Sequence, residues 1–360
     1  MSVDANQDEQ FMREALGEGA RGIGLTSPNP AVGAVVVRNG EIVGRGWHRR
    51  AGEPHAEVEA IADARSKGGG EIADGATLGG ATLGGATLGG ATLYVTLEPC
   101  STSGRTPPCV EAIREAKLAR VVVGATDPNP SHAGAGLVAL REAGIEVVEG
   151  VCATEARHLI RYFAKHIATG LPWVVAKTAA TLDGRTTLPE GESRWISSEA
   201  SREDVQRWRR QCDAILVGGE TFRVDNPSLT LRGAYAEGRP QPIRVVLTSD
   251  ANPPPGHRLF TDEFADRTRV HRGLTLRESL RRLGAEGVMS VMVESGGRLL
   301  SHALAEDLVD EVVLYLAPVF GGGGTRMISG DGIVGRLRDV EVSRIGPDVR
   351  ICGRVAKGGN

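Results

Sequence analysis

Short apolar runs alternate with helical segments along most of this chain. Runs of five to eight residues rich in Val, Ile and Leu are separated by stretches whose apolar residues recur at helical spacing. This alternation is typical of a layered α/β sheet with buried strands. The expected strands are 31–37, 41–47, 91–97, 120–126, 145–150, 173–179, 214–218, 243–249, 290–295 and 311–318. The expected helices are 11–21, 56–67, 108–119, 134–143, 153–169, 199–211 and 276–284.

The strand and helix series occurs twice, with one predicted helix between the two. Residues 153–169 place apolar side chains at helical spacing, and Gly170 is a suitable helix terminator. A chain of 360 residues with 41% hydrophobic residues has enough apolar material for two cores. We therefore expect a domain at 1–150, a connecting helix or linker at 151–172, and a second domain at 173–360.

Charge and cysteine content exclude several classes of protein. The net charge of −3 gives no global attraction to nucleic acid or to an anionic membrane, so small-molecule partners are favoured. A polar, acidic N-terminus and the lack of any apolar run near 18 residues favour a cytoplasmic location. Five irregularly spaced cysteines do not form a disulfide framework, which leaves metal binding or catalysis. The sequence leaves homo-oligomerisation open.

Two motifs together have the spacing of a catalytic zinc site. "PHAEVEA" supplies His55 and Glu57, whereas "EPC" and "PPC" supply Cys100 and Cys109. One imidazole and two thiolates leave a fourth tetrahedral position for water, as in catalytic rather than structural zinc sites. Zinc lowers the pKa of that water from about 16 towards about 7, and Glu57 is placed to move its proton. The order is that of zinc-dependent base deaminases, and we expect His55 and Cys109 in the first turns of helices.

Each part of this pattern has an ordinary explanation when it is taken alone. A His-x-Glu pair is common in helices, and two cysteines nine positions apart are also consistent with buried thiols. The metal site is favoured because all the parts occur in order, each flanked by proline and each at the end of a strand or the start of a helix. Cys152, Cys212 and Cys352 have no such partners, and we interpret them as core residues.

Eight motifs extend over nearly the whole length of the chain: "SPNPAVGAVVV" (27–37), "HAEVEA" (55–60), "TLEPCSTSGRTPPC" (96–109), "DPNP" (127–130), "KTAATLDGRTT" (177–187), "SRWISS" (193–198), "VDNPSLTLR" (224–232) and "VESGG" (293–297). With these motifs the chain resembles the bifunctional riboflavin-biosynthesis deaminase/reductase family. Eight residues separate Cys100 from Cys109, a gap that is specific to this family, whereas tRNA adenosine and cytidine deaminases have two. The resemblance implies an α/β chain with a zinc-dependent pyrimidine deaminase domain of the three-layer cytidine-deaminase fold at 1–150. It also implies an NADPH-dependent reductase domain of the dihydrofolate-reductase-like fold at 173–360.

The resemblance implies a first substrate that is a diaminopyrimidinone carrying a ribosylamino phosphate. Zinc would activate water against the ring carbon that bears the exocyclic amine, and Glu57 would protonate the departing ammonia. The implied substrate contacts are Asn29, His48, Arg105, Asp127 and Asn129. Each except Arg105 is also open to a plainer interpretation as a turn or structural residue. The chain departs from the family at Thr102, usually histidine, and at Ala135, usually basic.

The second half resembles a reductase that transfers hydride from NADPH to the sugar's anomeric carbon and gives a ribityl product. Such a step needs an oriented hydride donor, a proton donor and a phosphate clamp. The implied catalytic residues are Lys177, Asp225 and Glu294. The implied substrate contacts are Ser193, Trp195, Arg209, Leu229, Thr230 and Arg232, and the implied cofactor contacts are Thr221, Ser249, Gly296 and Gly297. Glu220 departs from the family, and 261–273 is short where the family often has another strand.

Other functions remain open at this point. In the first alternative, only one of the two domains is active. In the second, the chain is a nucleic-acid or nucleoside deaminase with an accessory domain. The third is a binding scaffold without catalysis. All four zinc-site residues are present, which argues against an inert first domain, and the acidic charge and the cysteine spacing argue against a nucleic-acid deaminase. The bifunctional enzyme is therefore the favoured hypothesis.

A pentapeptide repeat precedes the strand that leads to Cys100. Residues 75–94 read GATLG, GATLG, GATLG and GATLY, and the last copy continues into "YVTLEPC". Because side-chain alternation fixes the register of a strand, only that last copy is needed for the metal site. We expect the upstream copies to form a glycine-rich surface loop, whose extra length costs about 1 kcal/mol of closure entropy.

Overall fold

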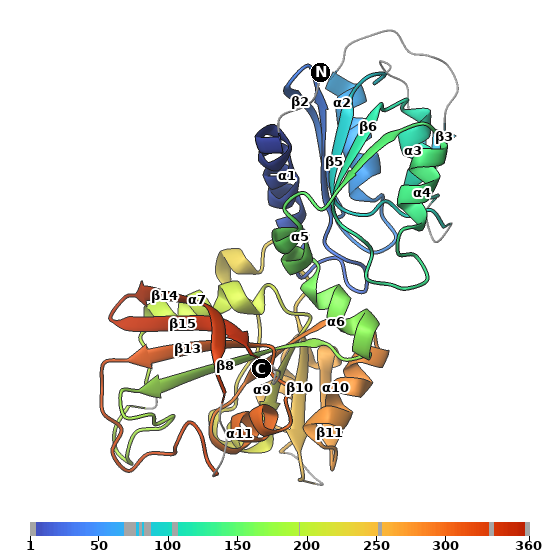
Figure 1. Cartoon of the computed structure of the whole chain (residues 1–360). Helices are drawn as coiled ribbons and strands as arrows, with labels where there is room; N and C mark the ends of the chain where they lie inside the picture. The colour runs from blue at the N-terminus through green and yellow to red at the C-terminus, as the bar shows by residue number, and fades with distance from the viewer. Residues whose placement is uncertain are drawn as a thin grey trace. The chain divides into compact units, whose positions relative to one another are not determined.

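The chain divides into two units, Met1–Thr169 and Gly170–Asn360, each with its own sheet (Figure 1). The structure is a computed structural model that describes residues 5–67, 77–78, 81–82, 88–102, 107–193, 195–250, 254–330 and 335–356. Within these ranges, no helix has the length and hydropathy needed to span a bilayer. Both units mix strands and helices, as the alternating sequence predicts.

The first unit contains a five-stranded sheet in the order β2-β1-β5-β6-β7. β1 is antiparallel to β2 and β5, whereas β5, β6 and β7 are parallel to one another. Asn39 and Gly40 turn the β1–β2 hairpin at φ values of 53° and 79°, which suits the Asn-Gly pair. The strands are β1 (Gly33–Arg38), β2 (Glu41–Trp47), β5 (Thr92–Leu97), β6 (Arg120–Ala125) and β7 (Glu146–Glu149).

Helices cover both faces of this sheet. Phe11, Met12 and Ala15 of α1 (Ala5–Ala20) pack on one face. The opposite face is covered by α2 (Ala56–Lys67), α3 (Cys109–Glu115) and α4 (Ala135–Glu142), as Figure 1 also shows. The strands are buried on both sides, which explains why β1, β5 and β6 read as continuous apolar runs.

One segment of the first unit differs from the sequence-based expectation, and another lies partly outside the described residues. Residues 153–169 form two helices, α5 (Ala153–Leu159) and α6 (Arg161–Thr169), and not one. Apolar spacing continues through the break at Ile160, so periodicity alone does not reveal it. In the repeat, β3 (Thr77–Leu78) pairs with β4 (Ala81–Thr82). The rest of the expected loop before residue 88 lies outside the described residues.

The second unit contains an eight-stranded sheet in the order β11-β10-β9-β12-β8-β13-β15-β14. The six strands from β11 to β13 in this order are parallel, and β15 and β14 continue the sheet in antiparallel orientation. The strands are β8 (Trp173–Thr181), β9 (Ala214–Gly218), β10 (Ile243–Thr248), β11 (Thr268–Arg272), β12 (Ser290–Glu294), β13 (Glu311–Ala317), β14 (Leu337–Ile345) and β15 (Asp348–Val355).

Helices also cover both faces of the second sheet. Leu276, Leu280 and Leu283 of α10 (Leu276–Ala285) pack on one face together with α11 (Gly297–Ala305). The opposite face packs against α7 (Glu199–Arg209), α8 (Gly219–Asp225) and α9 (Arg258–Thr261). Ligands of open parallel sheets bind beyond the carboxyl ends of the strands, so the segments that follow β8, β9, β10 and β12 are where a site is expected.

Several elements of the second unit have no counterpart among the expected elements. These elements are α8, α11 and the β14–β15 hairpin, for which no helix or strand was predicted. A strand also forms within the short segment 261–273, where β11 pairs with β10 in parallel. The segment 261–273 is therefore short but still contains a strand, β11.

Candidate functional site

The first unit brings together the three predicted metal ligands. His55 Nδ1 lies 3.2 Å from Cys109 Sγ and 3.6 Å from Cys100 Sγ. One ligand atom from each residue lies within 4.8 Å of the other two. Cys100 follows β5, Cys109 opens α3, and His55 directly precedes α2, one residue earlier than the predicted first helical turn. This donor set and geometry fit tetrahedral zinc with one open position.

Glu57 lies beside the ligand cluster and is shielded from solvent. Its side chain is only 3% exposed, and burial raises its pKa to about 7, although His55 and a hydrogen bond with Cys109 act in the opposite direction. The hydrogen bond between the two thiols lowers the pKa of Cys100 to about 4. A carboxyl group with a pKa near neutrality is suited to accepting a proton and then releasing it.

Asn29 and His48 lie next to the ligand cluster, on the side of His55. The His48 and His55 rings are 5.1 Å apart in an edge-on arrangement. His48 Nδ1 is 3.1 Å from the carbonyl oxygen of Pro54, so this nitrogen carries the proton and Nε2 is the acceptor. Asn29 Nδ2 donates to that Nε2 over 3.0 Å. His48 thereby fixes the amide of Asn29 with its carbonyl oxygen turned away from the imidazole.

Asp127 and Asn129 lie in a loop that hydrogen bonds to the buried Glu98 side chain, close to the metal ligand Cys100 in the sequence. Glu98, 6% exposed, accepts hydrogen bonds from the backbone N–H groups of Asp127, Gly134 and Gly136 over 3.1, 2.9 and 2.9 Å. A Cβ atom at Gly136 would lie 2.0 Å from the Pro99 carbonyl oxygen, so the two segments are in close contact. Glu98 was not among the predicted site residues, because its only signal in the sequence is its position before Pro-Cys.

The two departures from the family lie around this same loop. Thr102 Oγ1 is 3.4 Å from Nδ1 of His132, and Ala135 is exposed at the start of α4. An imidazole is thus still present beside Thr102, contributed from another part of the chain. Arg105, the predicted contact in this region, lies outside the described residues.

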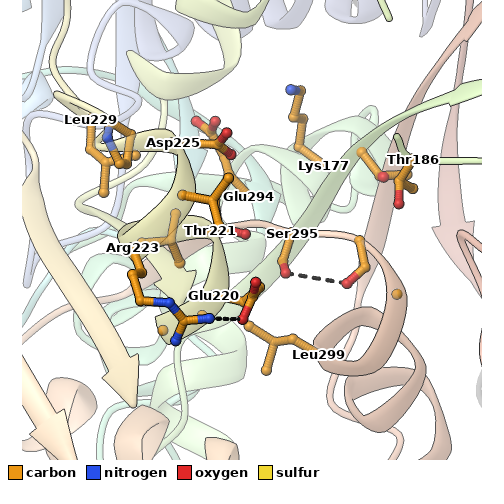
Figure 2. A pocket seen from close by; sticks show the side chains of 18 of the residues that line it. Lys177, Thr186, Glu220, Thr221, Arg223, Asp225, Leu229, Glu294, Ser295 and Leu299 are labelled. Atoms are coloured by element: carbon orange, nitrogen blue, oxygen red, sulfur yellow. Dashed lines mark hydrogen bonds and ion pairs between the residues drawn. The ribbon is translucent and has the colours of Figure 1, made fainter. Parts of the chain in front are cut away.

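The second unit has a cavity of about 1560 Å³ beyond the carboxyl ends of β8, β9, β10 and β12 (Figure 2). All three predicted catalytic residues line it, and so do the four predicted cofactor contacts. Of the predicted substrate contacts in this unit, Ser193 is not a lining residue and instead exchanges hydrogen bonds with the backbone of Trp195. The other five line the cavity: Trp195, Arg209, Leu229, Thr230 and Arg232.

A group of three charged side chains occupies the floor of this cavity. Lys177 and Glu294 are register partners on neighbouring strands, and Arg209 binds Glu294 through two hydrogen bonds of 2.6 and 3.0 Å. Burial lowers the pKa of Lys177, which favours release of its proton. Burial alone would raise the pKa of Glu294, but Arg209 and Lys177 outweigh it, so that this pKa is lowered and the group is anionic.

The segment 226–232 forms one wall of the cavity and is held by side chains from other elements. Arg209 donates to the Thr230 carbonyl over 2.9 Å, Gln241 bonds both backbone groups of Leu231, and Gln206 accepts from the Arg232 amide over 3.1 Å. Leu229 has a φ of 51°, unusual for a residue with a side chain. Such fixing of a strained backbone is typical of ligand sites.

Close backbone approaches explain two glycines at the cavity. A Cβ at Gly296 would lie 2.7 Å from Thr186, and a Cβ at Gly219 would lie 2.6 Å from Thr248 Oγ1. Thr221 and Ser249 lie nearby, after β9 and β10. The length of the cavity, its cationic lining and these glycines fit an extended phosphate-bearing cofactor such as NADPH together with a second ligand.

Comparison with protein families and known proteins identifies both units. Residues 5–125 match the cytidine and deoxycytidylate deaminase zinc-binding region, and residues 172–351 match the RibD C-terminal domain. The riboflavin biosynthesis protein RibD of Escherichia coli is 39% identical, with 95% of this chain and 98% of that protein covered. The Bacillus amyloliquefaciens protein of the same name is 38% identical, with 96% and 95% covered.

Solved structures give the same result for the whole chain. RibD of Acinetobacter baumannii has a TM-score of 0.85 at 34% identity and covers 98% of this chain and 100% of its own. The Thermotoga maritima diaminohydroxyphosphoribosylaminopyrimidine deaminase/5-amino-6-(5-phosphoribosylamino)uracil reductase has a TM-score of 0.83 at 32% identity, with 98% and 100% covered. The predicted fold class, a cytidine-deaminase-like unit followed by a reductase unit, is confirmed. The chain belongs to the RibD family and is a bifunctional enzyme of riboflavin biosynthesis, with a zinc-dependent deaminase and an NADPH-dependent reductase.

Proposed function

We propose that residues 1–150 deaminate 2,5-diamino-6-(5-phosphoribosylamino)pyrimidin-4(3H)-one and that residues 173–360 reduce the ribosyl group of the product, with 151–172 connecting them. The observation that carries the first half of the proposal is the convergence of His55, Cys100 and Cys109 around one point, with buried Glu57 beside them. We further propose that the enzyme acts on free small molecules in the cytoplasm, in keeping with its net charge of −3.

In the deaminase site, His55, Cys100 and Cys109 hold the zinc. Bound zinc supplies a Lewis acid that makes water a nucleophile near neutral pH. Glu57 accepts the proton from that nucleophile and delivers it to the leaving amine, which departs as ammonia. Asn29, oriented by His48, presents an amide to the pyrimidine edge, where it both donates and accepts hydrogen bonds. Asp127, Asn129 and Arg105 complete the substrate contacts.

Zinc binding by these ligands is directly testable. We expect the purified protein to hold about one zinc ion per chain and Cys109→Ser to retain less than a tenth of it, because a hydroxyl is a far poorer ligand than a thiolate. Cys352→Ser is the matched control, since Cys352 is a buried cysteine of the second unit. Elemental analysis under reducing, metal-replete conditions measures both. Full zinc content in Cys109→Ser would contradict the assignment.

In the reductase site, Lys177, Asp225 and Glu294 face the reacting part of the substrate. NADPH would supply the hydride, and the cavity-lining residues Thr221, Ser249, Gly296 and Gly297 would hold it. Lys177 donates a proton to the nitrogen of the open-chain imine, and Glu294 stabilises the ammonium before that transfer. The predicted contacts for the ribose phosphate are Ser193, Trp195, Arg209, Leu229, Thr230 and Arg232.

Arg209 has a structural role in this site in addition to the predicted phosphate contact. Three of its N–H groups are used by Glu294 and by the Thr230 carbonyl. It therefore joins the proposed catalytic carboxylate to the wall segment 226–232, and its remaining N–H groups are those that contact the phosphate. Thr230 and Arg232 extend this contact along the wall.

A coupled assay tests the whole proposal. The pyrimidine substrate is supplied to the purified enzyme, and ammonia release and NADPH oxidation are followed together. We expect ammonia first and then NADPH oxidation in equal amounts, because the deaminated product is the substrate of the second site. Ammonia without NADPH oxidation, or NADPH oxidation by the undeaminated substrate at the same rate, would contradict the proposed order.

A further inference from the structure

The lining of the reductase cavity is strongly cationic. Six arginines and one lysine line it against four carboxylates. The cationic residues are Lys177, Arg202, Arg209, Arg223, Arg232, Arg258 and Arg298, and the carboxylates are Glu220, Asp225, Asp250 and Glu294. An excess of positive charge in a concave site attracts anionic ligands, and both phosphate-bearing ligands of the proposed reaction are anions.

Several of these cations already have partners. Arg209 is paired with Glu294, and Arg202 donates to the Ser197 carbonyl. Arg223 is paired with Glu220 and lies 3.9 Å from a carboxylate oxygen of Asp250, so its charge is compensated. Figure 2 shows the contact between Arg223 and Glu220 at the edge of the cavity. These contacts leave each of the three arginines with fewer N–H groups for an incoming anion.

Arg258, like Arg232 and Arg298, is exposed in the cavity and has no guanidinium ion pair among the residues that the structure describes; of these three, it lies beside the wall segment through contacts to Asn226. We propose that Arg258 binds a phosphate monoester in this cavity together with Ser228 and Thr230. The proposal deepens the proposed reductase function and rests on it. Two hydroxyls and a planar guanidinium together offer the donors that phosphate oxygens accept.

The backbone of Arg258 is fixed at both ends of its turn. Its amide donates to the Asn226 side chain over 2.8 Å, and its carbonyl accepts from the Asp262 amide over 3.0 Å. Asn226 itself ends α8 in a left-handed conformation, with a φ of 41°. The next residue, Leu259, is fully buried in the core beneath. These contacts, including the one to Asn226 of the wall segment 226–232, therefore fix the position of the Arg258 backbone.

One buried guanidinium joins the two sides of the proposed phosphate site. Arg244 on β10 has no exposed surface and binds Asp262 through two hydrogen bonds of 2.6 and 2.7 Å. It also donates to the Ser228 carbonyl over 3.1 Å and to the Leu259 carbonyl over 3.0 Å. Ser228 and the residue after Arg258 are thus held by the same side chain. A preorganised site loses less conformational entropy when its ligand binds.

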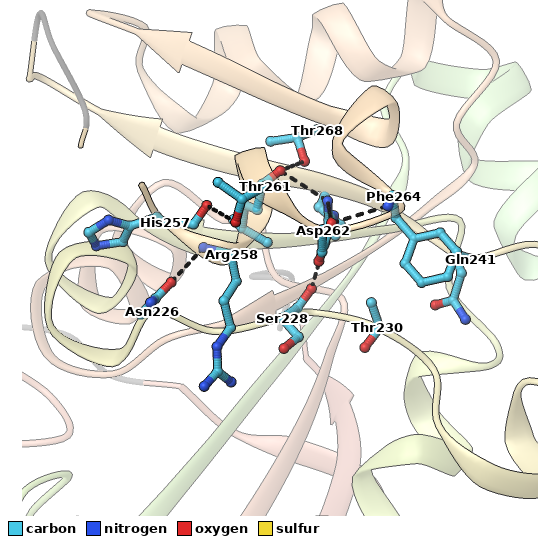
Figure 3. A network of polar contacts seen from close by, with 12 residues as sticks. Asn226, Ser228, Thr230, Gln241, His257, Arg258, Thr261, Asp262, Phe264 and Thr268 are labelled. Carbon is cyan, nitrogen blue, oxygen red and sulfur yellow. Dashed lines mark hydrogen bonds and ion pairs between the residues drawn. The ribbon is translucent and has the colours of Figure 1, made fainter. Parts of the chain in front are cut away.

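The side chains project in a common direction. In Figure 3 the Arg258 side chain extends from α9 toward the same side as the side chains of Ser228 and Thr230, away from Asp262. All three residues line the cavity. The buried pair thus forms the base of the site, and the three donors form its surface.

The ligand chemistry is a phosphate monoester, and two molecules of the proposed reaction carry one. The first is the 5-phosphate of the pyrimidine ribosyl substrate, and the second is the 2′-phosphate of NADPH. Ribose 5-phosphate and adenosine 2′-monophosphate are probes that separate these sources. Their binding to the full-length enzyme is measured by titration calorimetry and needs no turnover, so the result is independent of whether the proposed reaction occurs.

We expect Arg258→Ala to weaken binding of one probe at least tenfold, because a charge-assisted hydrogen bond to phosphate is lost. Arg258→Lys should lose less, since it keeps the charge without the planar fork. The matched control is Arg272→Ala, which removes an exposed arginine of the same unit that does not line the cavity. It should bind both probes as the wild type does.

Each outcome has a defined meaning. Weaker ribose 5-phosphate binding assigns Arg258 to the substrate, and weaker binding of adenosine 2′-monophosphate assigns it to the cofactor; either result supports the proposal. Unchanged affinity of Arg258→Ala for both probes would overturn it. A wild-type enzyme that binds a probe but does not oxidise NADPH with the pyrimidine substrate would refute the proposed function and leave the phosphate site intact.

Discussion

Glu57→Gln is expected to reduce ammonia release by a factor of about 100 to 10,000, the usual contribution of a positioned general acid and base. Glutamine has nearly the same shape as glutamate but cannot take up or deliver the proton. The buried position of Glu57 beside Cys109 leaves no exchange with bulk solvent to replace it. NADPH oxidation should be unchanged when the deaminated intermediate is supplied, because the reductase residues belong to a different core.

The control for this experiment lies two residues along the same helix. Glu59 is partly exposed and pairs with Arg49 over 3.4 Å, so Glu59→Gln makes the same chemical change outside the ligand cluster. It should retain both activities, and both variants should retain zinc. Loss of the reductase step in a folded Glu57→Gln enzyme would show that the two activities do not have separate sites.

Lys177→Met is expected to reduce NADPH oxidation at least a hundredfold while ammonia release stays at the wild-type rate. Methionine fills similar space but removes the ammonium that faces Glu294 across the paired strands β8 and β12. Because burial lowers the pKa of Lys177, the native ammonium is a better proton donor than an exposed lysine. Initial rates of NADPH consumption with the deaminated substrate measure the effect.

Two further measurements separate a chemical role for Lys177 from a structural one. The affinity for NADPH should change less than twofold, and ammonia release by the same preparation reports the folding of the first unit. Lys177→Arg keeps a positive charge but holds its proton more tightly, so it should not restore the rate. Restoration by arginine would show that only the charge matters and would exclude proton donation.

Most strands of the parallel sheets could be predicted from the sequence because burial on both faces makes them continuous apolar runs. β9 matches its predicted limits, and so does α2. The β14–β15 hairpin was missed because β14 is exposed along most of its length and therefore lacks the apolar run of a buried strand; its only alternation is the short stretch Val340–Val342. α8 was missed for another reason: its residues, GETFRVD, have weak helix propensity, and packing of Phe222 stabilises it.

The candidate metal site could be predicted because its chemistry requires particular residue types at particular spacings. The contributions of Glu98 and Arg258 could not. Glu98 accepts hydrogen bonds from three backbone amides, and backbone amides have no sequence signature. Arg258 lies at the cavity because Asn226 binds its backbone amide and Arg244 binds the carbonyl of the next residue, Leu259. Such roles depend on which segments meet in the folded chain, and local patterns do not encode that.

Glu98 also restricts how the deaminase half can be altered by recombination. One carboxylate holds the loop 127–136 against the segment that leads to Cys100, and Gly136 packs on Pro99 with no room for a side chain. A transplanted loop of different conformation would not place its backbone N–H groups against Glu98, and the buried carboxylate would lose its hydrogen bonds. The two segments are therefore a single exchangeable module, and variation in substrate choice in this half requires both to change together.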